Sequence, residues 1–344
     1  GRRFRPKTPG RPAQADHDDL SHPYERLTPD LILDAIESTG LQPDGHLLAL
    51  NSYENRVLQV GIEDQPPMVA KFYRPLRWSD DAIVEEHRFS SELAAQEIPI
   101  VAPWQQDGAG PLFRHEGFRF ALFPRRGGRA PEPGDLDQLE WIGRFIGRIH
   151  LAGQAQPFAY RPSLDVATMG WTARESVLQS PLLPPHEREG YAGASEALLS
   201  QIERRFATVG AQAIRLHGDC HHGNILWTDA GPHFVDLDDC RNGPAIQDLW
   251  MLLNGDRGER TVQLSAMLDG YSMFHELDPR ELALIEPLRG LRMVHYSGWL
   301  ANRWQDPAFP AAFTWVESPH YWSQHIQDLR QQLDVLSEPP LQLY

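Results

Sequence analysis

The sequence predicts an α+β fold of two lobes, with a sheet-rich lobe first and a mainly helical lobe after it. Three observations support this prediction. Short apolar runs separated by polar turns precede residue 124, as expected of strands. Residues 124–128, Pro-Arg-Arg-Gly-Gly, have the composition of a hinge. After them, apolar residues recur at helical spacing, for example Leu139, Ile142, Ile146 and Ile149.

This division also predicts the domain organisation. Residues 1–23 are rich in Arg, Pro and Asp and cannot bury enough apolar surface to fold, so we expect a disordered tail. Residues 24–124 then form the N-lobe and residues 125–344 form the helical C-lobe. The chain has 344 residues, 41% of them hydrophobic, which is enough for a core in each lobe.

Helix and turn signals locate the elements of the N-lobe. Thr28 followed by Pro29 predicts a helix start, and Gly40 predicts its end. Ser79 is a suitable N-cap for a second helix, which begins with acidic residues. The expected elements are a helix over 31–37, strands over 46–50, 56–60 and 68–73, a helix over 79–96, and strands over 99–101 and 117–123.

The C-lobe is expected to be helical apart from one hairpin. Residues 160–185 mix Pro, Ser and Leu irregularly, and we interpret them as an insertion over the site or the surface. A hairpin is expected from strands 225–227 and 233–235, joined by the turn 228–232. Helices are expected over 135–153, 187–206, 246–253, 262–271, 280–304 and 321–336.

The stretch from residue 216 to 239 carries the strongest functional signal. Asp219 is followed five residues later by Asn224, and Asp236 comes after the predicted hairpin. Phosphoryl transfer depends mainly on position and charge: one carboxylate for the attacking hydroxyl and oxygen ligands for Mg²⁺. We therefore expect Asp219 to accept the hydroxyl proton, and Asn224 and Asp236 to bind the Mg²⁺ that accompanies ATP.

A transition-metal site is the alternative interpretation of this stretch. His217, His221 and His222 lie beside Cys220, and all are ligand side chains. We disfavour this site because no second Cys/His cluster lies nearby and Asn is a poor ligand for such metals. His217 is expected to hydrogen-bond backbone near Asp236 and fix the loop, whereas His221 and His222 are expected on the loop surface.

Lys71 lies among apolar residues in the third predicted strand. A lone Lys in a half-buried strand usually points to solvent. Its position ahead of the two Asp motifs favours a role in binding phosphates instead. Either Glu85 or Glu86, on the following helix, is available to pair with it.

Charge and cysteine content restrict the partners. The chain has 32 Lys+Arg and 47 Asp+Glu, a net charge of −15, which argues against nucleic-acid and anionic-membrane binding and favours a cationic acceptor. Two cysteines, no signal peptide and no run of about 18 apolar residues predict a cytoplasmic protein that does not span a membrane. We expect a monomer.

The order of these parts resembles the protein-kinase-like fold of aminoglycoside and choline phosphotransferases. Longer strings are similar to the bacterial stress response kinase A family, cytoplasmic serine/threonine protein kinases on that fold. The similarity extends from about residue 24 to the end of the chain. The strings are residues 50–57, 71–75, 234–239, 241–245, 247–256 and 306–310.

The resemblance implies ATP- and Mg²⁺-dependent transfer to Ser or Thr of protein substrates, a part in the stress response, and self-phosphorylation. It implies nucleotide binding in the N-lobe and the acceptor site in the C-lobe. Asp248 is expected to accept backbone N–H groups of the catalytic loop, with a plain helix N-cap as the alternative. The implied site residues are Asp219 and Asp236 (catalytic), Ser52, Lys71 and Glu86 (ATP), and Asn224 and Asp236 (Mg²⁺).

Two departures from the usual protein-kinase pattern stand out. Asn51-Ser52-Tyr53-Glu54-Asn55 replaces the glycine-rich loop, so backbone and short polar side chains are expected to meet the phosphates. Gly218 replaces the Arg of His-Arg-Asp, and the segment from Asp236 to Asp248 is too short for a long activation loop. We therefore expect a site that is assembled without loop phosphorylation.

Two other functions were compared with this one. A small-molecule kinase for a choline- or aminoglycoside-like cationic alcohol would use an aromatic box, although aromatic residues at helical spacing are usually core. A nucleotide-binding scaffold without turnover is disfavoured because it has no need of Asp219. The candidate box residues are Tyr296, Trp299, Trp304, Trp315, Tyr321 and Trp322.

Overall fold

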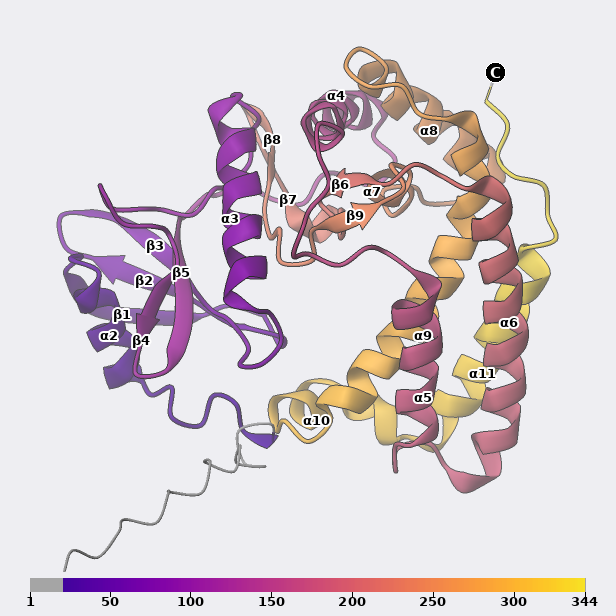
Figure 1. The fold of residues 1–344 in the computed structure, drawn as a ribbon, viewed down its shortest axis with the longest axis horizontal. Helices are drawn as coiled ribbons and strands as arrows, with labels where there is room; N and C mark the ends of the chain where they lie inside the picture. The colour runs from indigo at the N-terminus through magenta and orange to yellow at the C-terminus, as the bar shows by residue number, and fades with distance from the viewer. Residues whose placement is uncertain (1–20, 344) are drawn as a thin grey trace, which may run out of the picture.

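The computed structural model describes residues 21–343. Apart from residues 21–23, the expected tail lies outside the described residues. The fold is α+β, with a sheet-rich N-terminal part and a helical C-terminal part, as predicted (Figure 1). Among the described residues, none of the helices is both long enough and apolar enough to cross a membrane.

The N-terminal part is a five-stranded antiparallel sheet in the order β1-β2-β3-β5-β4. Lys71 is paired with Val57 on the neighbouring strand on one side and with Ala121 on the other, so its strand is central in the sheet. The strands are β1 (Pro43–Ala49), β2 (Arg56–Ile62), β3 (Gln65–Phe72), β4 (Phe113–His115) and β5 (Phe118–Pro124).

The prediction of a strand over residues 99–101 is wrong. Ile100 makes an isolated bridge to Phe234, and the segment does not join the sheet. Pro99 and Pro103 flank it and lack the N–H groups that a sheet ladder needs, while the apolar side chains still pack in the core. The short β4 takes the edge position and was not predicted, because its three residues carry almost no strand pattern.

Two helices flank this sheet. The first, α2 (Pro29–Ser38), begins at the predicted cap, where the Thr28 hydroxyl accepts a hydrogen bond from the Leu31 N–H. The second, α3 (Asp80–Ala95), is capped by Ser79 and lies between the sheet and the C-terminal helices (Figure 1). The apolar side of α2 packs on the sheet, which explains the hydrophobic spacing of its sequence.

The helices of the C-terminal part share one large core. The region 160–185, expected to be irregular, contains a π-helix (Ala167–Thr172) and a helix, α5, against which α9 packs. The helix expected over 246–253 is a single turn, and the one expected over 280–304 begins as a 3₁₀-helix (Pro279–Leu284). The α-helices are α4 (Leu136–Gly153), α5 (Ala173–Leu178), α6 (Arg188–Val209), α7 (Gln247–Trp250), α8 (Arg257–Tyr271), α9 (Ile285–Arg303), α10 (Ala308–Ala312) and α11 (Pro319–Val335).

Two small strand pairs flank the loops that contain the motif residues. The predicted hairpin is confirmed: β7 (Ile225–Thr228) pairs with β8 (Gly231–Phe234). A second pair, β6 (Ile214–Leu216) with β9 (Arg241–Gly243), was not predicted. Figure 1 shows both pairs between α3 and the C-terminal helices.

Candidate active site

The β7–β8 hairpin brings Asn224 and Asp236 to the same end. The Val235 N–H donates to the Asn224 carbonyl oxygen at 3.0 Å, which extends the hairpin pairing by one step. Asp236 then adopts a left-handed backbone with φ 60°, which Asp tolerates better than most residues. The Asp238 N–H donates to Asp236 Oδ1 at 3.2 Å and fixes that carboxylate.

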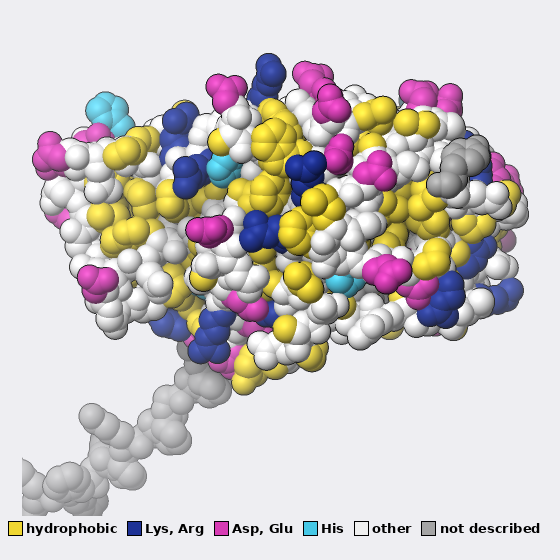
Figure 2. All heavy atoms as spheres, turned by 90° about the horizontal axis from the view of Figure 1, so that it is seen from above, with side chains coloured by type: hydrophobic (Ala, Val, Ile, Leu, Met, Phe, Trp, Pro, Cys, Tyr) yellow, Lys and Arg dark blue, Asp and Glu magenta, His cyan; other side chains and the backbone are white. Residues whose placement is uncertain are grey.

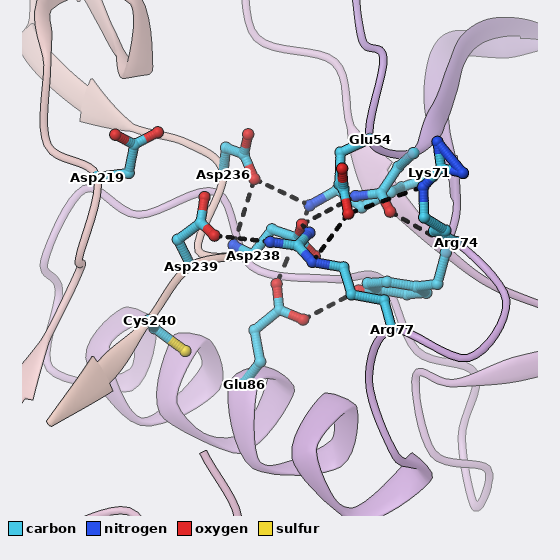
Figure 3. Close-up of polar contacts among 12 residues, drawn as sticks. Glu54, Lys71, Arg74, Arg77, Glu86, Asp219, Asp236, Asp238, Asp239 and Cys240 are labelled. Atoms are coloured by element: carbon cyan, nitrogen blue, oxygen red, sulfur yellow. Dashed lines mark hydrogen bonds and ion pairs between the residues drawn. The ribbon is translucent and has the colours of Figure 1, made fainter. Parts of the chain in front are cut away.

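Lys71 points toward this carboxylate and not toward solvent. Its side chain is 9% exposed, with Nζ 3.3 Å from Asp236 Oδ1 and 4.0 Å from Glu86 Oε1 (Figure 3). Burial would lower the pKa of Lys71, but the Asp236 and Glu86 carboxylates outweigh burial and raise that pKa. The ammonium group therefore stays charged at neutral pH.

The choice between Glu85 and Glu86 is settled by helix geometry. Neighbouring residues on α3 point about 100° apart, so they cannot serve the same partner. Glu86 is buried and also accepts a hydrogen bond from Tyr73 Oη at 3.1 Å. Glu85 instead accepts three backbone N–H groups at 2.7–2.9 Å, those of residues 159–161, and holds that loop.

His217 holds the loop of Asp219 in place, as predicted. The Asp219 N–H donates to His217 Nδ1 at 3.2 Å, so the proton lies on Nε2, which donates to the Val235 carbonyl oxygen at 2.8 Å. This second bond joins the loop of Asp219 to the segment that carries Asp236. The two acidic residues are thereby fixed relative to each other.

Gly218 explains the absence of the usual Arg before the Asp. Its φ is 94°, and a Cβ at this position would lie 2.2 Å from the Asp239 carbonyl oxygen. The two loops therefore approach so closely that no side chain fits between them.

Asp248 holds the loop of Asp219 through hydrogen bonds to the loop backbone. It is buried, and its oxygens accept the N–H groups of His217 and Gly218, each at 2.9 Å. His150 Nε2 lies 2.8 Å from the same carboxylate. Burial would raise the pKa of Asp248, but the His150 hydrogen bond and the backbone N–H groups lower it. The bracing role is thus confirmed and the plain N-cap is wrong.

We expect Asp248→Ala to lower the free energy of unfolding by about 3 kcal/mol or more, because several buried partners lose a charged acceptor. Urea unfolding of the two proteins measures this difference. Asp256→Ala is a matched control, since Asp256 is an exposed N-cap on α8, worth about 1 kcal/mol. Equal losses in the two variants would contradict the bracing role.

His221 was expected on the loop surface, and its side chain is 37% exposed, but it also contacts Asp219, which was not predicted. Its Nδ1 accepts the Gly223 N–H at 3.0 Å, so Nε2 carries the proton, and Nε2 lies 3.4 Å from Asp219 Oδ2. Burial would raise the pKa of Asp219, but the His221 hydrogen bond and the Arg292 charge outweigh burial and lower that pKa. Asp219 is therefore a carboxylate at neutral pH.

Several predicted site residues surround one cavity of about 310 Å³. Asp219, Asp236 and Ser52 line it directly. Lys71 contacts the cavity residue Asp236, and Glu86 in turn contacts Lys71. Asn224 is joined to the cavity residue Asp219, because its Nδ2 donates to the Asp219 carbonyl oxygen at 2.8 Å. Residues from both parts of the chain thus meet at the same cavity.

A charged cluster beside this cavity was not predicted from the sequence. Glu54, in the loop between β1 and β2, meets Arg77 Nε at 3.2 Å, Arg303 Nη2 at 2.8 Å and Trp299 Nε1 at 2.5 Å. Arg77 also contacts Asp238 and Asp239, and Figure 3 shows it between the loop and these two acids. The cluster ties the loop of Ser52 to α9 and to the segment after Asp236.

The six aromatic candidates do not form one box. Tyr296 and Trp299 line the cavity. Trp322 is buried in the core, and Trp304 Nε1 donates to Glu317 at 3.0 Å. Their spacing therefore mainly reflects packing on the C-terminal core.

The donor atoms beside the cavity suit Mg²⁺. Asn224 Nδ2 is held by a loop carbonyl, so its Oδ1 is the atom available to a cation. The Asp236 side chain is 48% exposed and adds carboxylate oxygens. Within residues 21–343, no group of three or more His, Cys, Asp or Glu residues is arranged to hold a metal ion. Mg²⁺ that arrives with ATP needs only one or two protein ligands, because phosphates complete its shell.

Curated proteins align with nearly the whole of this chain. Stress response kinase A of Salmonella choleraesuis is 46% identical over 325 residues, 94% of this chain and 98% of that protein. Serine/threonine protein kinase RdoA of Salmonella typhimurium is also 46% identical, with the same coverage. Stress response kinase A of Escherichia coli is 45% identical over 93% of this chain and 97% of that protein.

Solved structures share the fold at low identity. Amicoumacin kinase hAmiN, in complex with AMP-PNP, Ca²⁺ and Ami, superposes with a TM-score of 0.70 at 17% identity, covering 94% of this chain and 97% of that one. Choline kinase LicA from Streptococcus pneumoniae superposes with a TM-score of 0.59 at 14% identity, covering 89% of this chain and 98% of that one. Residues 46–285 match the phosphotransferase enzyme family. With its kinase relatives aligned over nearly their whole length, the chain belongs to the phosphotransferase enzyme family and, within it, to the stress response kinase A group.

Proposed function

We propose that this protein is an ATP- and Mg²⁺-dependent serine/threonine protein kinase of the bacterial stress response that also phosphorylates itself. The observation that carries the proposal is the meeting of Asp219, Asp236 and Lys71 at one cavity. Identity to proteins named serine/threonine protein kinase and stress response kinase A supports the acceptor class and the process. We further propose that it acts as a monomer in the cytoplasm.

Each site residue then has a specific task. Asp219 accepts the proton of the acceptor hydroxyl, and its lowered pKa keeps it ionised, as a proton acceptor must be. Asn224 and Asp236 offer oxygen ligands to Mg²⁺. Lys71, kept charged and oriented by Glu86, contacts the α- and β-phosphates. When bound, ATP supplies the phosphoryl group and Mg²⁺ offsets its charge.

The two lobes divide these tasks. Residues 24–124 hold the nucleotide, and residues 125–344 contribute the base and the acceptor site. The cluster of Glu54 with Arg77 and Arg303 keeps the Ser52 loop beside the catalytic segment without a phosphorylated activation loop. This supports a site that is assembled before any modification.

Incubation with labelled ATP tests the proposal against the small-molecule alternative. The protein is incubated alone and then with a mixture of basic and acidic proteins, choline, and an aminoglycoside. Label on Ser or Thr supports the proposal, and label on choline or the aminoglycoside alone rejects it.

Ser52 gives a second test, of the phosphate-binding loop. Ser52 lines the cavity, so Ser52→Ala should weaken ATP binding by about 1 kcal/mol through the loss of a hydrogen bond from its hydroxyl. Ser52→Asp places a negative charge beside the triphosphate and should weaken binding far more. Calorimetric titration with ATP and Mg²⁺ measures both. Ser337→Asp, exposed and outside the cavity, controls for added charge. Near-wild-type affinity in both Ser52 variants would place Ser52 outside the phosphate site.

A further inference from the structure

The arginines of the cavity differ in how well they are paired. Arg77 contacts three carboxylates, and Arg241 Nε donates to the Asp239 carbonyl oxygen at 2.9 Å. Arg292 on α9 is different: its side chain is 51% exposed, and among the described residues a single carboxylate, that of Asp219, lies within 4.0 Å, with Oδ1 at 3.9 Å. A guanidinium without a close partner therefore lies next to the proposed base.

A second cavity of about 370 Å³ continues from this point along α9. Arg292 and Tyr296 line both cavities, so the two make one groove, which we term the α9 groove. Arg289 lies one helical turn before Arg292 and lines the second cavity together with Tyr321 and Asp328. Its Nε donates to Glu286 at 3.0 Å, while its guanidinium lies over the Trp250 ring, 5.0 Å from the centroid.

The second cavity of the groove differs in charge from the chain as a whole. The net charge is −15, but on the face drawn in Figure 2 acidic and basic side chains are interspersed. Exposed charges more than about 10 Å apart are largely screened at physiological salt, so the acceptor responds mainly to the groove. The first cavity is lined by more acids than arginines, whereas the second cavity has two arginines, Arg289 and Arg292, and one lining acid, Asp328. The preference for a cationic acceptor, expected from the net charge, is therefore not expected along the second cavity.

We propose that the α9 groove selects acceptor segments that carry an anionic side chain close to the phosphorylated Ser or Thr. The inference rests on the proposed protein-kinase function and adds the class of substrate. The anion is the carboxylate of Asp or Glu or the phosphate of an already phosphorylated residue, which present the same chemistry to a guanidinium. Arg292 and Arg289 are the specificity-determining residues.

The distances limit where the anion lies in the acceptor. The hydroxyl reacts at Asp219, and Arg292 lies 3.9 Å from that carboxylate. Arg289 lies one turn earlier in α9, on the side of Arg292 away from Asp219, and about 5–6 Å from Arg292. An extended peptide advances about 3.3–3.6 Å per residue, so the anion belongs within about three residues of the Ser or Thr.

A positional peptide library tests this with labelled ATP and the full chain. Each peptide has one Ser or Thr and one fixed Glu, phosphothreonine, Ala or Lys, placed one to three residues on either side. We expect wild-type protein to phosphorylate the Glu or phosphothreonine peptides about tenfold or more faster than the Lys peptides at one or more positions. The Glu and phosphothreonine arms distinguish the two sources of the anion.

Charge reversal gives the decisive comparison. In Arg289→Glu/Arg292→Glu the ratio of Glu-peptide to Lys-peptide rates should invert, and any general loss of activity cancels in that ratio. Arg280→Glu is the matched control, because Arg280 is exposed and pairs only with Asp278 among the described residues. Its ratio should equal that of wild type.

Other results overturn the inference in distinguishable ways. Two results reject the inference while the proposed kinase function stands. In the first, wild-type protein labels all peptides at similar rates, without an anionic preference. In the second, the double variant loses the same fraction of its rate on every peptide. The second of these results would assign Arg292 to the donor phosphates instead. Label on no peptide and none on the protein itself rejects the proposed function, and the inference with it.

Discussion

Asp219→Asn is expected to reduce phosphoryl transfer by about 10³-fold or more while ATP binding stays close to that of wild type. A positioned general base contributes roughly 10²–10⁴-fold, and here the same carboxylate also orients the attacking hydroxyl. Asn keeps the size of Asp219 and leaves intact the bond to His217 and the 2.8 Å bond from Asn224, because these use its backbone, while its Oδ1 can still accept the longer bond that Asn224 makes to the Asp219 side chain. Single-turnover rates and calorimetric ATP titration measure the two quantities separately.

A matched control removes a carboxylate from the same part of the chain. Asp229 is exposed in the turn of the β7–β8 hairpin and does not line the cavity, so Asp229→Asn should transfer phosphate like wild type. Turnover by Asp219→Asn within a few-fold of wild type would reject Asp219 as the base. Because its pKa is held low, wild-type activity should not fall through protonation of Asp219 until the pH drops below the usual Asp range.

Sequence alone predicted the parts of the site that depend on local signals. The hairpin could be predicted because two apolar runs flank a turn rich in Asp, Gly and Pro. Pairing of Ile225 with Phe234 then necessarily brings Asn224 near Asp236. Lys71 and His217 were assigned from their order along the chain. The structure agrees, since Lys71 contacts Asp236 and His217 bonds to the Val235 carbonyl.

What the sequence could not predict depends on contacts between distant segments. Glu54 binds Trp299 and Arg303 across about 250 positions of the chain, and no local pattern reports such a pairing. His221 lies at the surface as assigned, but its contact with Asp219 could not be predicted, because it depends on the turn at Gly223, which directs the ring toward that carboxylate. The loose pairing of Arg292 with Asp219 likewise appears only once α9 is packed beside the catalytic loop.

Asp236→Asn is expected to reduce the transfer rate by about 10³-fold, because the metal's charge stabilisation at the phosphates is worth several kcal/mol. Asn is the suitable replacement. It tolerates the left-handed backbone at φ 60°, whereas Ala there adds strain of about 1–2 kcal/mol, and its Oδ1 still accepts the Asp238 N–H. Loss of rate in this variant therefore reports on charge and metal binding, with the fold preserved.

The sign of the change in ATP affinity separates a metal ligand from a structural residue. With Mg²⁺ present, Asp236→Asn should bind ATP more weakly and require more Mg²⁺ for half-maximal rate. With EDTA present it should bind ATP as well as wild type or better, because the carboxylate that repels the triphosphate is gone while Lys71 remains beside it. Calorimetric titration with and without Mg²⁺ measures both affinities. Weaker binding by the same factor in both conditions, or an unchanged Mg²⁺ midpoint, would show that Asp236 does not hold the metal.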